Sequence, residues 1–138
     1  MSVIVPIISR PLPMAILVAA WNAGIPLTCR LFKNNYTPAD ATLVSDFDEA
    51  DYAGYAAQVL TGWSDIGYDV DNRSILEADA LTWTITASNQ TIYGMYVTSA
   101  GGTVLWWGER RAAGPIALDA ATNPSFVLIP RFSGTSEF

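Results

Sequence analysis

Alternation of apolar and polar residues in short runs predicts a chain built mainly from β-strands. In residues 76–87, Leu81, Trp83 and Ile85 alternate with three threonines. Successive side chains of a strand point to opposite faces of its sheet, so this run predicts a strand with one buried face. Residues 26–32 alternate in the same way and predict another strand.

Turn residues divide the rest of the chain into further short elements. Two β-rich runs within residues 91–111 flank Ser99–Gly102, whose glycines can take positive φ, and this arrangement predicts a hairpin. Residues 41–47 predict one or two helical turns, and the polar residues 64–74 predict a surface loop. Further strands are expected in residues 55–63, 114–120 and 125–132.

The N-terminal segment is apolar and is interrupted by three prolines: Pro6, Pro11 and Pro13. It could pass for a signal peptide, but the prolines leave no continuous apolar span of about 20 residues for a membrane helix. Pro13 suits a first helical turn and Gly24 a helix end, which predicts one short helix. We expect residues 1–11 to form an extended arm that grips a neighbouring subunit. The expected contact residues of the arm are Val3, Ile4, Val5, Ile7 and Ile8.

These elements predict one β-rich domain over residues 12–138, preceded by the arm. Several short strands at turn-punctuated spacing favour an antiparallel sandwich or a jelly-roll-like barrel with one short N-terminal helix. No internal repeat, linker or low-complexity segment divides the 138-residue chain.

Composition points to protein contacts rather than to nucleic acid. Charged residues make up 14% of the chain and hydrophobic residues 51%, so a domain of this size should leave apolar surface for other subunits to cover. The net charge of −6 lacks the basic footprint that phosphate binding needs. There is no histidine, and the single cysteine, Cys29, lies in an apolar run and is expected to be a small buried hydrophobe.

The acidic segment Ser45–Tyr55 is the strongest candidate for chemistry, with carboxylates at Asp46, Asp48, Glu49 and Asp51. Its spacing fails the EF-hand pattern, which needs glycine at the sixth position and glutamate at the twelfth. A looser calcium or magnesium site and a carboxylate-pair hydrolase remain open as alternatives. The favoured interpretation is a turn with exposed carboxylates, some of which cap a short helix. No catalytic, metal or cofactor residue is predicted.

Adjacent tryptophans form the second candidate site. Trp106 and Trp107 should lie on opposite faces of one strand, so that at least one leaves the core. With Trp63, Tyr93 and Tyr96 they would form either a sugar-stacking surface or part of a subunit interface.

Two stretches resemble a recurrent pattern in small virion proteins of tailed bacteriophages. They are LFKNNYTPADATLVSDFDEADYAGY and TIYGMYVTSAGGTVLWWGER, and the resemblance extends over roughly residues 31–116. It implies a non-enzymatic capsid cement or decoration protein on the virion surface, made in the host bacterial cytoplasm. Its implied partners are the major capsid protein and further copies of itself, as a dimer or trimer, with no nucleic acid, membrane or cofactor. The alternative is a tail or head-fibre module that binds host glycan through exposed aromatic side chains.

Overall fold

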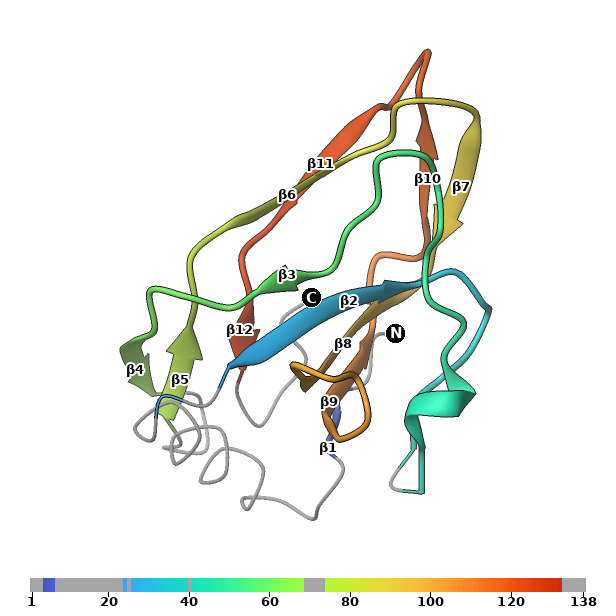
Figure 1. The fold of residues 1–138 in the computed structure, drawn as a ribbon. Helices are drawn as coiled ribbons and strands as arrows, with labels where there is room; N and C mark the ends of the chain where they lie inside the picture. The colour runs from blue at the N-terminus through green and yellow to red at the C-terminus, as the bar shows by residue number, and fades with distance from the viewer. Residues whose placement is uncertain (1–3, 7–23, 25, 40, 69–73, 133–138) are drawn as a thin grey trace.

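A computed structural model describes residues 4–6, 24, 26–39, 41–68 and 74–132, and these form mainly antiparallel β-structure (Figure 1). The strands form open sheets, and none closes into a barrel within the described residues. No helix in this part of the chain is long and apolar enough to span a bilayer. The strands are β1 (Ile4–Pro6), β2 (Leu27–Phe32), β3 (Gln58–Val59), β4 (Ser64–Tyr68), β5 (Ser74–Glu77), β6 (Leu81–Thr84), β7 (Asn89–Ile92), β8 (Gly94–Ser99), β9 (Leu105–Arg110), β10 (Ile116–Asp119), β11 (Ser125–Leu128) and β12 (Arg131–Phe132).

The largest sheet has the strand order β1-β9-β8-β2-β3, with every neighbouring pair antiparallel. One face of β2 carries Leu27, Cys29 and Leu31 into the main hydrophobic core. The other face of the sheet is also covered, because Phe32 and Tyr96 are buried beneath residues 33–49. We call this sheet, its covering segment (residues 33–39 and 41–51), and the β12-β5-β4 sheet the base.

Four strands form a second region that rises from the base (Figure 1). β6 pairs with β11, and β7 pairs with β10, so that two antiparallel ribbons enclose an apolar interior. Trp83 of β6 stacks on Phe126 of β11 with ring centroids 5.7 Å apart. We call β6, β7, β10 and β11 the lobe. Its interior is continuous with the main core of the base, since both belong to one cluster of buried residues.

A smaller aromatic core lies on the opposite face of the base sheet. Phe47 stacks on Tyr96 with ring centroids 4.4 Å apart and planes 6° apart, and it also contacts Phe32. The chain needs glycine at Gly108 for this packing, because a Cβ there would approach the Phe47 ring to 2.8 Å. Phe47 follows the single short helix of the described residues, the 3-10 helix η1 (Val44–Asp46), which confirms a helical turn in 41–47.

Several sequence expectations are confirmed. β2 and β6 lie where the alternating runs placed them, and β6 has the predicted pattern of buried and exposed positions. β8 and β9 pair around the turn at Ser99–Gly102, where Gly102 has a φ of +74°.

The surface-loop prediction for residues 64–74 is wrong in part. β4 occupies Ser64–Tyr68, and β5 begins at Ser74. Backbone pairing between these strands does not depend on side-chain polarity, so a polar sequence can still add to a sheet. The pairing is irregular, with a register shift between Asp65 and Tyr68.

Two other expected strands differ in extent. The expected strand 55–63 shortens to Gln58–Val59, at the edge of the base sheet. The run beginning at Thr91 is not continuous: it breaks at Tyr93, between β7 and β8. Gly94 allows this change of sheet, because a Cβ there would collide with the Glu109 carbonyl oxygen and the Phe32 ring. The expected helix after Pro13 lies outside the described residues.

Candidate functional site

The acidic segment runs along an edge of β2 and completes the base sheet. β3 pairs only with Thr28 and Cys29. Farther along, the Ala50 amide donates to the Leu31 carbonyl at 2.9 Å, and the Lys33 amide donates to the Asp48 carbonyl at 2.8 Å. Since unpaired backbone groups at a buried edge are costly, these bonds give residues 48–50 a structural task that does not use their carboxylates.

Glu49 lies at the centre of a part-buried polar network. Both of its carboxylate oxygens accept from Arg30 Nη1 at 3.1 Å, and the Tyr55 hydroxyl donates to Glu49 Oε2 at 2.7 Å. Arg30 Nε also donates to Thr98 Oγ1 at 3.0 Å. Burial, and then the hydrogen bond to Glu49, raises the pKa of Tyr55 well above its ordinary value, so the phenol remains a proton donor.

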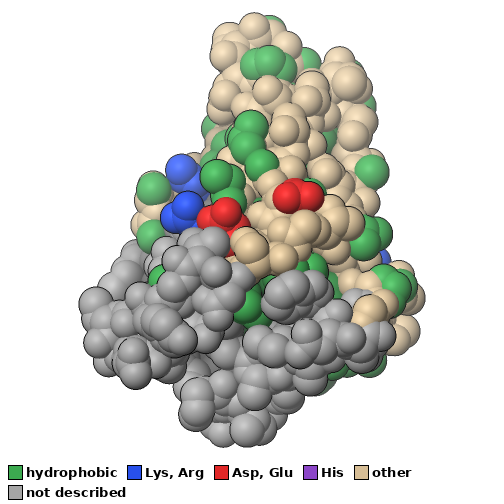
Figure 2. Space-filling model, turned by 90° about the vertical axis from the view of Figure 1, so that its left-hand side faces the viewer, with side chains coloured by type: hydrophobic (Ala, Val, Ile, Leu, Met, Phe, Trp, Pro, Cys, Tyr) green, Lys and Arg blue, Asp and Glu red, His purple; other side chains and the backbone are tan. Residues whose placement is uncertain are grey.

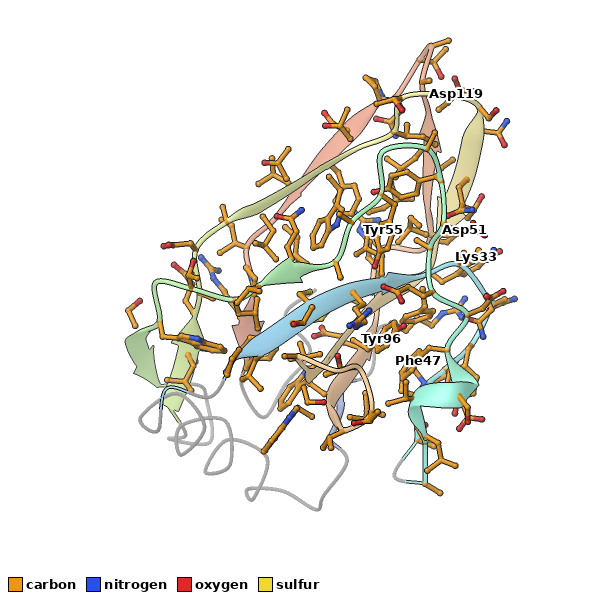
Figure 3. All side chains as sticks on the ribbon, viewed as in Figure 1. Lys33, Phe47, Asp51, Tyr55, Tyr96 and Asp119 are labelled. Atoms are coloured by element: carbon orange, nitrogen blue, oxygen red, sulfur yellow. The ribbon has the colours of Figure 1, made fainter. Side chains whose placement is uncertain are left out.

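The same phenol joins the network to the sheet. The Leu31 amide donates to the Tyr55 hydroxyl oxygen at 3.2 Å, so one side chain serves both the backbone of β2 and Glu49. Figure 3 shows Tyr55 on the segment that crosses over β2. With both partners engaged, the geometry gives Glu49 the role of a structural anion.

Asp51 joins the base to the lobe. Its Oδ2 accepts from Lys33 Nζ at 2.9 Å, and its Oδ1 accepts from Gln90 Nε2 of β7 at 2.7 Å. The Asp51 amide in turn donates to Gln90 Oε1 at 3.0 Å. The hydrogen bond from Gln90, followed by that from Lys33, lowers the pKa of the Asp51 carboxyl. Figure 3 places Asp51 and Lys33 next to each other at this junction.

The remaining two acids point elsewhere. Asp46 Oδ2 accepts from the Leu43 amide at 2.8 Å and holds the start of η1, as expected of a capping carboxylate. Asp48 is exposed, and its amide donates to Asn34 Oδ1 at 2.9 Å. The four carboxylates therefore have separate surroundings, and within the described ranges no three acidic, cysteine or histidine side chains form a metal-binding group.

Trp106 and Trp107 occupy an irregularity in β9. Trp107 pairs with Val97 and Leu105 pairs with Thr98, which leaves Trp106 as an extra residue in the ladder. The expectation of opposite faces is wrong, because the bulge changes the alternation and both indoles pack against the main core. Trp107 is only 1% exposed and meets Phe132 edge to face at 5.2 Å, whereas Trp106 is half-buried.

The other aromatic candidates also pack within the chain. Trp63 is half-buried, and its ring lies 5.6 Å from that of Phe132. Tyr93 is half-buried beneath the Arg110 guanidinium, which lies 5.3 Å from the ring centroid. Tyr96 is buried under Phe47. The described residues thus present these rings on different elements, without a shared exposed platform.

Two of the expected arm residues can be located. Ile4 and Val5 belong to β1, where they pair with Glu109 and Gly108 of β9. The described part of the arm is therefore an edge strand on a sheet of its own chain. Val3, Ile7 and Ile8 lie outside the described residues.

The structure confirms the expected burial of Cys29 and reveals three polar residues that were not predicted from the sequence. Cys29 is buried as expected, and burial raises the pKa of its thiol to about 12. Arg30, Tyr55 and Gln90 were not recognised as the partners of the acidic segment. One signal was available for Arg30, since it is the single charged residue in an otherwise uncharged strand, residues 27–32. Gln90 carried no such signal, because its partner lies 39 positions away.

No protein-family model matches the chain, and no curated protein or solved structure is similar enough to support an assignment.

Proposed function

We propose that this chain is a non-enzymatic structural protein of a bacteriophage virion that binds the major capsid shell and stabilises it. The virion assignment rests on the resemblance of residues 31–116 to small tailed-phage proteins. We also propose that the strands are arranged as a β-sandwich or in a jelly-roll-like manner, with one short N-terminal helix.

One observation carries the non-enzymatic part of the proposal. The segment with the most reactive residue types serves as scaffold: residues 48–50 complete an edge of β2, Glu49 is bound by Arg30 and Tyr55, and Asp51 is bound by Lys33 and Gln90. Catalytic acids need room for a substrate and a pKa suited to proton transfer. Here the carboxylates of Glu49 and Asp51 hold segments of the chain together instead.

Low charge density supports a role in assembly. A chain that is 14% charged and 51% hydrophobic has fewer solvating groups than an ordinary soluble domain. Interface cores are depleted of charge in the same way. A cement protein fits this composition because it contacts several neighbours at once.

The test is copy number and binding on the particle. Quantitative mass spectrometry of purified virions should find the chain at a copy number comparable to that of the major capsid protein. The purified chain should also co-sediment with shells assembled from that capsid protein and raise the temperature at which they disassemble. A few copies per particle, or copies confined to the tail, would contradict the proposal.

The glycan-binding alternative has its own test. Trp63→Ala and Tyr93→Ala alter half-buried rings without emptying the centre of the core, so they suit a glycan-array comparison better than Trp107→Ala. Glycan binding that both substitutions abolish in a folded chain would favour the alternative over the cement role.

A further inference from the structure

The surface of the lobe is almost free of charge. Residues 80–108 contain no aspartate, glutamate, lysine or arginine, and residues 112–130 contain only Asp119. Figure 2 shows one face of the molecule. Its upper part carries neutral side chains, and its acidic and basic groups lie lower down. In an average soluble domain about a quarter of the residues are charged, and most of these lie at the surface. A neutral surface of this kind is typical of a contact region.

β11 forms an open edge of this neutral region. It has one partner strand, β6, within the described residues. The opposite edge of β6 is occupied by residues 53–58, through bonds such as Gln58 Nε2 to the Thr82 carbonyl and the Thr86 amide to the Ala53 carbonyl. β10 bridges to the turn before β11 through Asp119 and Asn123, and its ladder partner is β7.

The hydrogen-bond pattern shows which backbone groups face outward. The Ile85 amide donates to the Pro124 carbonyl at 2.7 Å, so the backbone carbonyl of Pro124 points toward β6. Backbone groups alternate in direction along an antiparallel strand. Ser125, Val127 and Ile129 therefore direct their amides and carbonyls away from β6, at the open edge.

Two usual protections of an edge strand, charged side chains and a proline at an outward position, are missing here. Edge strands commonly carry charged side chains or a proline that removes an outward donor. The run from Ala120 to Pro130 has no charged residue. Its prolines at positions 124 and 130 both direct their carbonyls inward, because these accept from Ile85 and Ala78. The three outward amides are intact.

The outward positions also carry exposed side chains. Val127 is 62% exposed and Ile129 45% exposed, among the largest exposures of aliphatic side chains in the described part of the chain. Ser125 is exposed as well. An edge that combines free donors and acceptors with exposed aliphatic groups is a template for another strand.

We propose that β11 of a second copy of this chain occupies this edge. Two β11 strands related by a two-fold axis through Val127 would pair antiparallel and join the lobes by a continuous β6-β11-β11-β6 sheet. Val127 would face Val127 of the partner subunit, and Ser125 would face Ile129 of the partner subunit. This register forms about six backbone hydrogen bonds between the copies.

Charge favours a second copy at this place. Each copy has a net charge of −6, so approach through the base brings acidic surfaces together. Contact through the neutral β11 edge keeps the acidic groups of the two bases farther apart and so reduces that repulsion. The inference concerns self-association in solution and does not depend on binding to a capsid, so the two proposals can fail separately.

Charge substitutions on the two-fold axis give a direct test. Sedimentation velocity of the full chain at about 100 µM should show dimers. Val127→Lys and Val127→Asp should each weaken dimerisation by about tenfold or more, because like charges would face each other across the axis. Mixing the two variants should restore dimers, since lysine then faces aspartate.

Val59 provides the matched control. It is an exposed valine on another edge strand, β3, with 52% exposure, so Val59→Lys and Val59→Asp make the same charge changes elsewhere. These variants should dimerise like the wild-type chain. Far-ultraviolet circular dichroism checks that all four variants fold, and Ile129→Lys replaces Val127→Lys if that variant does not. A wild-type chain that is monomeric at this concentration overturns the proposal, as does a dimer that the charges at position 127 leave intact.

Discussion

The base and the lobe share one hydrophobic core, but different interactions hold their outer segments in place. In the base, ion pairs tie neighbouring segments together: Arg30 with Glu49, Lys33 with Asp51, and Arg131 with Glu77. In the lobe, backbone ladders connect four strands, and the outward side chains are mostly threonine, serine, asparagine and small aliphatic residues.

This difference teaches where the fold needs charge. Residues 33–39 and 41–57 contain little regular secondary structure, so side chains must fix their path. Charge-assisted hydrogen bonds are suited to this task because they are short and directional. The lobe has regular pairing and needs no such ties, which leaves its surface free to be neutral. This division between base and lobe can be tested by substitution, beginning with the core that the two regions share.

The largest effects should come from the tryptophans in that shared core. Trp107 of the base and Trp83 of the lobe are 1% and 2% exposed. Replacing either by alanine should lower the free energy of unfolding by about 3–5 kcal/mol, since each leaves a large cavity. Because one core links the regions, urea unfolding should remain a single transition in both variants.

A second urea-unfolding transition in Trp83→Ala alone would show that the lobe unfolds separately. It would contradict the view that one core links the base and the lobe. If the alanine variants do not fold, Trp83→Phe and Trp107→Phe make the same comparison with smaller cavities. Trp106→Ala serves as the control, because this half-buried neighbour should cost less than Trp107→Ala.

The next largest effect on stability should distinguish two acidic residues of the same segment, Glu49 and Asp48. Glu49→Gln removes the charge that accepts from Arg30 and Tyr55, and it should cost about 1–2 kcal/mol of unfolding free energy. Asp48→Asn changes an exposed carboxylate and should stay within about 0.5 kcal/mol of the wild-type chain. Urea unfolding with unchanged slopes measures both values. Equal costs for the two changes would contradict the structural role of Glu49.

The sequence predicted strands best where the alternation of apolar and polar residues matches the alternation of buried and exposed side chains. β6 follows its alternation because one face meets the core and the other meets solvent. The break at Tyr93 was hidden, since Gly94 is needed by contacts with Phe32 and Glu109, which are distant along the chain. The faces of Trp106 and Trp107 were assigned wrongly for a similar reason: a bulge depends on the partner strand, and the local sequence does not reveal it.

The candidate site was predicted only in outline. The failure of the EF-hand spacing and the expectation that some of the carboxylates cap a short helix followed from local residues, and the structure identifies Asp46 as such a carboxylate. The partners of Glu49 and Asp51 depend on how β2 and β7 are placed in space, so periodicity could not supply them. Long-range pairs of this kind require the tertiary fold.

A smaller effect should test whether folding requires the neutrality of the lobe. Thr84→Lys and Val127→Lys each add a charge at an exposed position of the lobe. At a concentration where the chain is monomeric, both should change the unfolding free energy by less than about 0.5 kcal/mol, as is usual for exposed positions. A loss well above this value would mean that the neutral surface serves stability, and the contrast between base and lobe would need another cause.

The smallest effect lies at Asp51, where the base meets the lobe. Its carboxyl pKa should lie below the ordinary value of 3.8, because Gln90 and Lys33 favour the ionised form. The stabilisation from Asp51 is therefore present above the unfolded pKa and is lost as the pH falls through the lower, folded pKa. Gln90→Ala should raise the pKa toward 3.8, and by more than Lys33→Gln does, since the Gln90 bond is the larger cause. Carboxyl NMR titration measures each shift. If only Lys33→Gln moves the pKa, Asp51 is tied to the base alone, and the contact with β7 does not join the two regions.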